Sequence, residues 1–147
     1  MNRVSSNILA YIAGLVDGEG CLSFCRTGKY YKNTNIPLQY PRLQIVNTNL
    51  KVIKFINAIF SGYIRKANLR HYTISKKPLY IYVLNYQKAI NAIKSLKKYL
   101  IVKHKQAEIF IQYGELCKQK HFGHFGTPIK LINKRDKLAL LCKSLNH

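Results

Sequence analysis

Residues 12–20 join a segment with the apolar period of a helix to a segment with the alternation of a strand, and they place two carboxylates at the junction. Asp17 and Glu19 are two of only five acidic residues in the chain. A helix that begins near Ser6 would end at about Asp17, and the partial negative charge of a helix C-terminus disfavours carboxylates there. A bound divalent cation would offset that cost. The stretch therefore indicates a helix-to-strand turn and a candidate metal ligand.

The charge of the chain points to a polyanionic partner. The sequence has 25 Lys and Arg residues against 5 Asp and Glu residues, so its formal net charge is +20. Such a field favours nucleic acid. A membrane surface is the competing polyanion, but no apolar run reaches the ~20 residues of a spanning helix, and the N-terminal residues lack a signal-peptide pattern. We expect a soluble, intracellular protein without a membrane partner, located in an organelle (chloroplast or mitochondrion) or in a bacterial cytoplasm.

The cysteines and histidines give little sign of a structural metal. The four cysteines form no Cys-x-x-Cys pair, which disfavours a zinc ribbon or a redox motif, and we expect reduced thiols. His121 and His124 follow Cys117 at a spacing that fits no common ligand pattern. An ordinary basic loop is therefore favoured there over a metal site.

Hydrophobic periodicity predicts an α+β chain with the order α-β-β-α-β-β-α-α-α. In the first strand, Leu22 and Phe24 alternate with Ser23 and Cys25, which is typical of a sheet with one polar face. The length suits one domain with its own core. The expected helices cover residues 6–17, 50–60, 86–100, 103–118 and 127–144, and the expected strands cover residues 20–31, 38–46, 63–74 and 79–84.

Residues 12–20 resemble the signature of the LAGLIDADG homing endonucleases, which cut both strands of DNA and are encoded within introns and inteins. Among the positions that differ, Val16, Gly18 and Glu19 replace the Ile, the Ala and the last Asp of the signature. The core fold of that family is α-β-β-α-β-β-α with a DNA-binding antiparallel sheet. The resemblance covers about residues 6–118 of a single domain over 1–147, and residues 119–147 would form a C-terminal helical extension. The matching residues are Ala13, Gly14, Leu15, Asp17 and Gly20.

One copy of the motif implies a homodimer, because family members with two motifs act as monomers. The dimer axis would run between the two motif helices. Small residues let helix backbones approach closely, so we expect Ala10, Ala13 and Gly14 to form the dimer interface together with Asp17. The alternative is an ordinary core helix that has a small side.

The resemblance implies hydrolysis of a long, roughly palindromic duplex site with Mg²⁺ as the cofactor, and Mn²⁺ is also possible. Mg²⁺ usually takes only one or two protein carboxylates, so one carboxylate per subunit is enough. The resemblance implies Glu19 as the metal ligand, with the carbonyl oxygen of Gly18 beside it. For Asp17 we expect a more structural role, as an acceptor for backbone N–H groups near helix ends. The alternative for Glu19 is a solvated surface acid.

Three more positions match residues that surround the active-site water in the single-motif homodimers, namely Asn47, Lys51 and Lys103. A Lys in this place could orient water or stabilise the negative charge that develops on the phosphorane. We therefore expect Glu19 and these three residues to form the catalytic group. A solvated polar or basic residue is the alternative at each position.

The sheet is expected to read DNA, because β-ribbons fit the major groove. Arg can pair with guanine and Gln with adenine, whereas lysines hold phosphates. A register error of one residue would move every side chain to the other face. A basic hairpin tip at residues 71–77 could reach along the duplex, or it is a simple basic turn. The expected DNA-facing residues are Ser23, Cys25, Thr27, Lys29 and Tyr31 in the first strand, Tyr40, Arg42 and Gln44 in the second, and Arg65 with Tyr80 or Tyr82 in the second hairpin.

The favoured function is thus a site-specific DNA endonuclease. An RNA maturase encoded by an intron, or a DNA-binding protein without cleavage, would use the same fold, and RNA is a partner only under the maturase alternative. An unrelated basic structural protein, such as a ribosomal one, would leave the acidic pair at the helix end unexplained.

Overall fold

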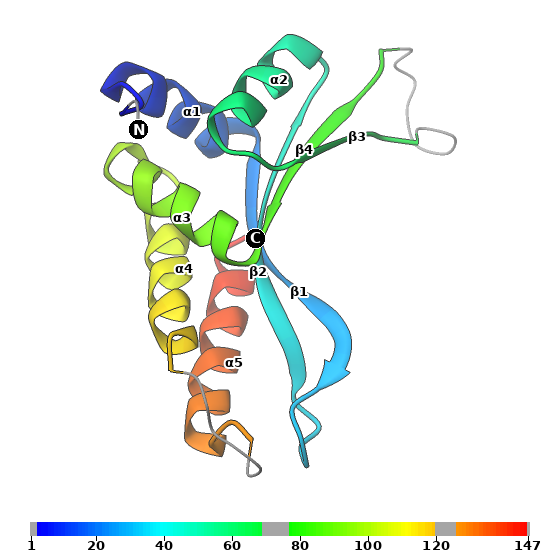
Figure 1. Cartoon of the computed structure of the whole chain (residues 1–147), viewed down its shortest axis with the longest axis vertical. Helices are drawn as coiled ribbons and strands as arrows, with labels where there is room; N and C mark the ends of the chain where they lie inside the picture. Colours follow the sequence, from blue (N-terminus) through cyan, green and yellow to red (C-terminus); the bar gives the residue numbers. More distant parts are fainter. Residues whose placement is uncertain (1–2, 69–76, 120–125, 147) are drawn as a thin grey trace.

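The computed structural model describes residues 3–68, 77–119 and 126–146 of the chain. It confirms the α+β class and the expected order of elements, to which it adds one short 3-10 turn, η1. The last three helices, α3 (Tyr86–Leu96), α4 (His104–Cys117) and α5 (Ile129–Ser144), lie together on one side of the strands (Figure 1). The elements are α1 (Ser6–Glu19), β1 (Gly20–Tyr30), β2 (Pro37–Asn47), α2 (Leu50–Ile59), β3 (Tyr63–Lys66), β4 (Tyr80–Asn85), α3 (Tyr86–Leu96), η1 (Lys97–Tyr99), α4 (His104–Cys117) and α5 (Ile129–Ser144).

Helix α1 is longer than the sequence pattern predicts. Its N-terminus is capped by Ser5, whose hydroxyl accepts a hydrogen bond from the N–H of Ile8 at 3.4 Å. The expected end at Asp17 is wrong, because the helix continues to Glu19 and the chain leaves it at Gly20. A Cβ on Gly20 would lie 2.6 Å from the carbonyl oxygen of Val16. The tight exit therefore requires a glycine at position 20, and Gly18 remains helical.

The four strands form one sheet with the order β1-β2-β4-β3, and each neighbouring pair is antiparallel. Leu22 lies opposite Leu43, and Ile45 lies opposite Tyr82. These side chains share one face and are buried in the core. The other face carries Ser23 opposite Arg42 and Cys21 opposite Gln44. The pairing therefore divides the sheet into a core face and a more polar face.

The core is formed where the core face of the sheet meets the helices. Ile12 and Val16 of α1 pack there with Phe110 of α4 and Cys142 of α5, and each is fully buried. Burying one large apolar side chain contributes about 1.5–3 kcal/mol relative to leaving it exposed. The last helix thus belongs to the same core as the motif helix.

Helices α4 and α5 also hold the far half of the first hairpin. The hydroxyl of Tyr113 donates to the carbonyl oxygen of Gln39 at 2.8 Å. The side-chain amide of Gln39 donates to Asp136 at 2.9 Å. Buried Arg135 donates to the carbonyl oxygen of Leu116 at 2.9 Å and lies 3.4 Å from the Tyr31 hydroxyl. The hairpin is therefore supported along its length on the helical side.

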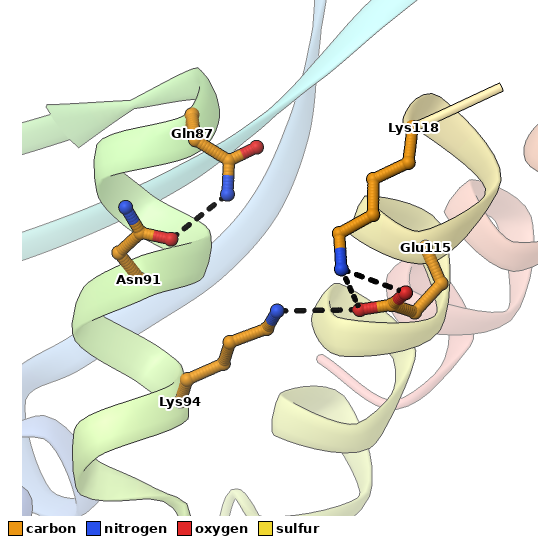
Figure 2. A network of polar contacts seen from close by, with 5 residues as sticks. All are labelled: Gln87, Asn91, Lys94, Glu115 and Lys118. Atoms are coloured by element: carbon orange, nitrogen blue, oxygen red, sulfur yellow. Dashed lines mark hydrogen bonds and ion pairs between the residues drawn. The ribbon is translucent and has the colours of Figure 1, made fainter.

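A polar network links α3 to α4 at the surface (Figure 2). Glu115 accepts from Lys94 at 3.2 Å and from Lys118 at 2.9 Å. The hydrogen bond from Lys118, followed by the one from Lys94, holds the pKa of Glu115 below its ordinary value. In the same view, Gln87 donates to Asn91 one turn along α3 at 2.8 Å.

Some expectations lie outside the described residues, namely the hairpin tip at positions 71–76 and the pair His121 and His124. All four cysteines lie within the described residues, and none of them forms a disulfide bond. Across the described helices, no segment is both long enough and apolar enough to span a bilayer.

Candidate active site and nucleic-acid interface

Glu19 and Asn47 meet where α1 ends and β2 ends. The side-chain amide of Asn47 donates to Glu19 Oε2 at 2.5 Å, and both residues are at the surface. The Oδ1 atom of Asn47 accepts from the N–H of Asn49 at 2.7 Å, which fixes the orientation of the amide. The structure therefore brings together two of the four predicted catalytic residues and orients the Glu19 carboxylate.

Asp17 joins the end of α1 to the start of α4. Its carboxylate accepts from the backbone N–H of Ile101 at 2.8 Å and from that of Lys103 at 2.9 Å. Partial burial raises the pKa of Asp17, but hydrogen bonds from backbone N–H groups of residues 101–103 outweigh it and hold the pKa below its ordinary value. The expected role as an acceptor for backbone groups near helix ends is confirmed.

The amino group of Lys103 lies at the C-terminal end of α1. Its Nζ donates to the carbonyl oxygen of Asp17 at 2.5 Å, two residues before Glu19 in the chain. Lys51 lies in the first turn of α2, and its backbone N–H donates to the capping side chain of Asn49 at 3.0 Å. The side chain of Lys51 is exposed. Lys103 is thus held at the end of α1 by its contact with Asp17, and the catalytic roles of Lys103 and Lys51 both stay predictions.

The donors at this junction suit a hard divalent cation. Glu19 offers an exposed carboxylate, and Gly18 belongs to the last turn of α1, where carbonyl groups lack intrahelical partners. Mg²⁺ prefers such oxygen ligands. Within residues 3–68, 77–119 and 126–146, no three His, Cys, Asp or Glu side chains are grouped as metal ligands. Metal binding by the Glu19 carboxylate and the carbonyl oxygen of Gly18 stays a prediction.

The polar face of the sheet carries most of the residues that were expected to read nucleic acid. The pairs Ser23 with Arg42 and Cys25 with Tyr40 lie on this face. Arg65 on β3 lies opposite Ile81 of β4, on the same side. Contact of these residues with DNA stays a prediction, but their placement on one face follows from the register. Gln44 also lies on the polar face, and its contact with DNA likewise stays a prediction. Thr27 and Lys29 are exposed near the end of β1.

The expectation that Tyr80 or Tyr82 of β4 faces the DNA is wrong, because the strand register puts both side chains on the core face of the sheet. Tyr82 is 0% exposed and its hydroxyl donates to the carbonyl oxygen of Phe60. Burial raises the pKa of Tyr82 well above its ordinary value. Tyr80 lies two residues away on the same side and packs against the core. Ile81 and Val83 take the polar face instead, and the near-continuous apolar run of this strand hid that parity.

Tyr31 is also wrongly assigned to the polar face. The β1–β2 register shifts between Arg26 and Tyr30, and Gly28 within this irregularity has a φ of 81°, a conformation that favours glycine. The simple alternation therefore fails beyond Arg26. Tyr31 is only 9% exposed, and its ring lies on the helical side against Arg135.

Two of the α1 residues expected in the dimer interface are exposed and one is buried, while the interface itself stays a prediction. Ala10 and Gly14 are exposed, and nothing lies within 4 Å of a Cβ built on Gly14. Ala13 is 0% exposed and belongs to the core of its own subunit, so it is not available to a partner. The difference arises because Ala13 lies one residue from buried Ile12 on the helix face that packs on the sheet.

Exposed apolar side chains near α1 are the residues that the sequence analysis missed. Ile101 is 86% and Val102 is 71% exposed, directly beside Asp17. On the helix itself, exposed Tyr11 contacts Phe55 of α2, with ring centroids 5.9 Å apart. Ile101 and Val102 could have been identified from the sequence, because they are two adjacent β-branched apolar residues between charged segments.

Comparison with known proteins bears on the family and the fold of this chain. The family model described as LAGLIDADG endonuclease matches residues 12–114, more than half of the chain. No protein among the curated sequences matches it. The homing endonuclease I-CvuI in complex with its target is 18% identical, with a TM-score of 0.71, and the match covers 93% of this chain and 80% of that chain.

Two further solved structures are similar. The archaeal intron-encoded homing endonuclease I-Vdi141I in complex with DNA is 21% identical, with a TM-score of 0.70, and the match covers 95% of this chain and 84% of that chain. The meganuclease I-SmaMI bound to DNA is 18% identical, with a TM-score of 0.65, and the match covers 89% of this chain and 43% of that chain. Such low identities show the fold alone. The family model covers the helix-to-strand junction and the whole sheet, and on this evidence the chain belongs to the LAGLIDADG endonuclease family.

Proposed function

We propose that this protein is a site-specific double-strand DNA endonuclease that acts as a homodimer with Mg²⁺, for which Mn²⁺ can substitute. The observation that carries the proposal is the exposed Glu19 carboxylate at the end of α1, oriented by Asn47 at 2.5 Å. The amino group of Lys103 donates a hydrogen bond to the carbonyl oxygen of Asp17, which precedes Glu19 by two residues in the chain. Membership of the family supports the same reaction class. The proposal also includes that the protein is encoded in an intron and acts in homing, and this part is based on family membership alone.

The reaction needs a nucleophilic water and a stabilised leaving oxygen. Divalent ions supply both when they are bound. In this chain, Glu19 and the carbonyl oxygen of Gly18 would hold the ion. The amide of Asn47 binds one oxygen of the Glu19 carboxylate and so restricts its rotation. Lys103 places a cation where negative charge develops on a phosphate, which lowers the free energy of the transition state.

The polar face of the sheet is the proposed DNA-binding surface. It lies opposite the helices, and it carries Arg42, Gln44 and Arg65. A net charge of +20 favours binding to the phosphate backbone. Binding should therefore weaken steeply with salt, while side chains in the major groove select the sequence.

The proposed homodimer interface is the exposed side of α1. One subunit supplies one Glu19, whereas cutting two strands needs a carboxylate for each. Ala10 and Gly14 permit a close approach of two helices, and Ile101 and Val102 add apolar area that water otherwise contacts. A two-fold axis along this surface would place the two Glu19 carboxylates near each other and make the DNA site a rough palindrome.

The test is cleavage of a randomised duplex DNA library with Mg²⁺. Native protein is compared with Glu19→Gln and with Glu115→Gln, which removes the same charge from an exposed position on α4. We expect native protein and Glu115→Gln to cut one pseudo-palindromic site on both strands, and Glu19→Gln to bind that site without cutting it. Cleavage by Glu19→Gln at the native rate would contradict the proposed site. Retention of RNA without any DNA cleavage would favour a maturase instead.

A further inference from the structure

Four side chains form a compact cluster on the polar face, at the junction of β4 and α3. Arg42 donates from Nε to Oδ1 of Asn85 at 3.1 Å and from Nη2 to the hydroxyl of Tyr40 at 2.8 Å. The ring of Tyr40 stacks on Tyr86, with centroids 4.4 Å apart and an angle of 18° between the planes. The Arg42 guanidinium also lies 5.6 Å from the centre of the Tyr40 ring. The guanidinium is therefore held from two sides.

Two local features at this junction are unfavourable, one at Asn85 and one at Tyr86. Asn85 is the N-cap residue of α3, where Asn commonly caps the helix, yet its side chain makes no capping bond. The Oδ1 atom that would cap the helix accepts from Arg42 instead. Tyr86 has a φ of 54°, which is unusual for a residue other than glycine. Two unfavourable local features thus coincide with one partly buried cluster.

The two bonds use the N–H of Nε and one N–H of Nη2, so they do not use the second N–H of Nη2 or the two of Nη1. Arg pairs with the O6 and N7 atoms of guanine through two N–H groups, and such a pair depends on a fixed plane. A guanidinium that is already held loses less conformational freedom when it binds.

We propose that Asn85 and Tyr86 are positioning residues that, through Tyr40, hold Arg42 in the orientation that selects one guanine per subunit. This inference rests on the proposed DNA-binding function. Strain at the junction is retained because it fixes the plane of Arg42 on the DNA-reading face. Asn85 provides the acceptor, and Tyr86 provides the stacking surface.

The experiment measures discrimination between bases by cleavage. The guanine read by Arg42 is the position at which Arg42→Ala loses its base preference. At this position kcat/KM is measured for guanine and adenine duplexes with native protein, Asn85→Ala and Tyr86→Gly. Two conservative variants are matched to these, since Asn85→Asp keeps an acceptor and Tyr86→Phe keeps the stacked ring.

We expect Asn85→Ala and Tyr86→Gly to lower the preference for guanine about fivefold or more, and the conservative variants to keep it. Because glycine adopts a positive φ readily, Tyr86→Gly should not lower the thermal unfolding midpoint. A merely structural role predicts the reverse, namely a lower midpoint with unchanged discrimination, and that result would overturn the inference.

Chemical substitutions in the DNA distinguish a base contact from a phosphate contact. Replacing the guanine by 7-deazaguanine removes the N7 acceptor, and we expect cleavage by native protein to fall while Arg42→Ala is indifferent. If only methylphosphonate substitution has this effect, Arg42 binds a phosphate and the inference is wrong. Sequence-specific cleavage with unchanged discrimination in both variants would overturn the inference alone, whereas absence of sequence-specific DNA cleavage by native protein would overturn the proposed function as well.

Discussion

The amide of Asn47 lies 2.5 Å from the carboxylate of Glu19, although 28 positions separate the two residues in the chain. One residue ends β2 and the other ends α1. Pairing of β1 with β2 brings these ends together, because Gly20 lies opposite Ile45. The fold thus orients its exposed carboxylate with a neutral donor that does not compete for a cation.

The first prediction concerns this donor. Asn47→Ala should lower the cleavage rate about 10–100-fold, which is typical when a partner of a metal-binding carboxylate is lost. The cause is free rotation of Glu19, so a higher Mg²⁺ concentration should restore part of the rate. Single-turnover cleavage over a Mg²⁺ series measures this. Asn91→Ala on α3 is the control, and a native Mg²⁺ dependence in Asn47→Ala would contradict the prediction.

The second prediction concerns stability and pH at Asp17. The pKa of Asp17 is lowered in the folded protein, by backbone N–H groups that outweigh its burial, so its stabilising effect is present above the unfolded pKa near 3.8 and is lost as pH falls through the folded pKa. Asp17→Asn should lower the free energy of unfolding at pH 7 by about 1–2 kcal/mol, because it loses charged hydrogen bonds to Ile101 and Lys103. Urea unfolding at pH 7 and below pH 4 should show this difference shrinking. A constant difference would contradict the prediction.

The third prediction separates the two faces of β4. Tyr82→Phe removes the hydrogen bond to the Phe60 carbonyl group and should lower the free energy of unfolding by about 1 kcal/mol. DNA affinity at a fixed salt concentration should not change, because Tyr82 is buried. Arg65→Ala on the polar face is the comparison, and it should weaken DNA binding without a loss of stability. Weaker binding by Tyr82→Phe would restore the original expectation for this residue.

The fourth prediction tests the exposed side of α1. Gly14→Leu meets nothing within 4 Å at its Cβ, and loss of a helical glycine should stabilise the isolated subunit by about 0.5–1 kcal/mol. A dimer that packs at Gly14 would nevertheless be blocked. Sedimentation equilibrium should therefore give a dimer for native protein and a monomer for Gly14→Leu. Lys105→Leu adds the same side chain to the exposed side of α4 as a control, and dimeric Gly14→Leu would place the interface elsewhere.

The sequence alone determined the order of the elements and the place of the junction at residues 12–20. Apolar period and alternation are local properties, so they identify helices and strands without knowledge of their partners. The same holds for Asp17 and Glu19, whose position between a helix and a strand marks them as unusual. The parity of β1 and β2 up to Arg26 was also predictable, because polar and apolar residues alternate there.

Tertiary structure decided what depends on partners. The side taken by Tyr82 follows from its pairing with Ile45, because β4 is apolar on both faces and has no alternation to read. Burial of Ala13 follows from how α1 lies on the sheet, and Tyr31 turns inward through an irregularity that alternation does not contain. The contact of Glu19 with Asn47 and the bond from Arg42 to Asn85 join residues far apart in the chain. A local pattern carries no distance between such residues, because only the pairing of strands brings them together.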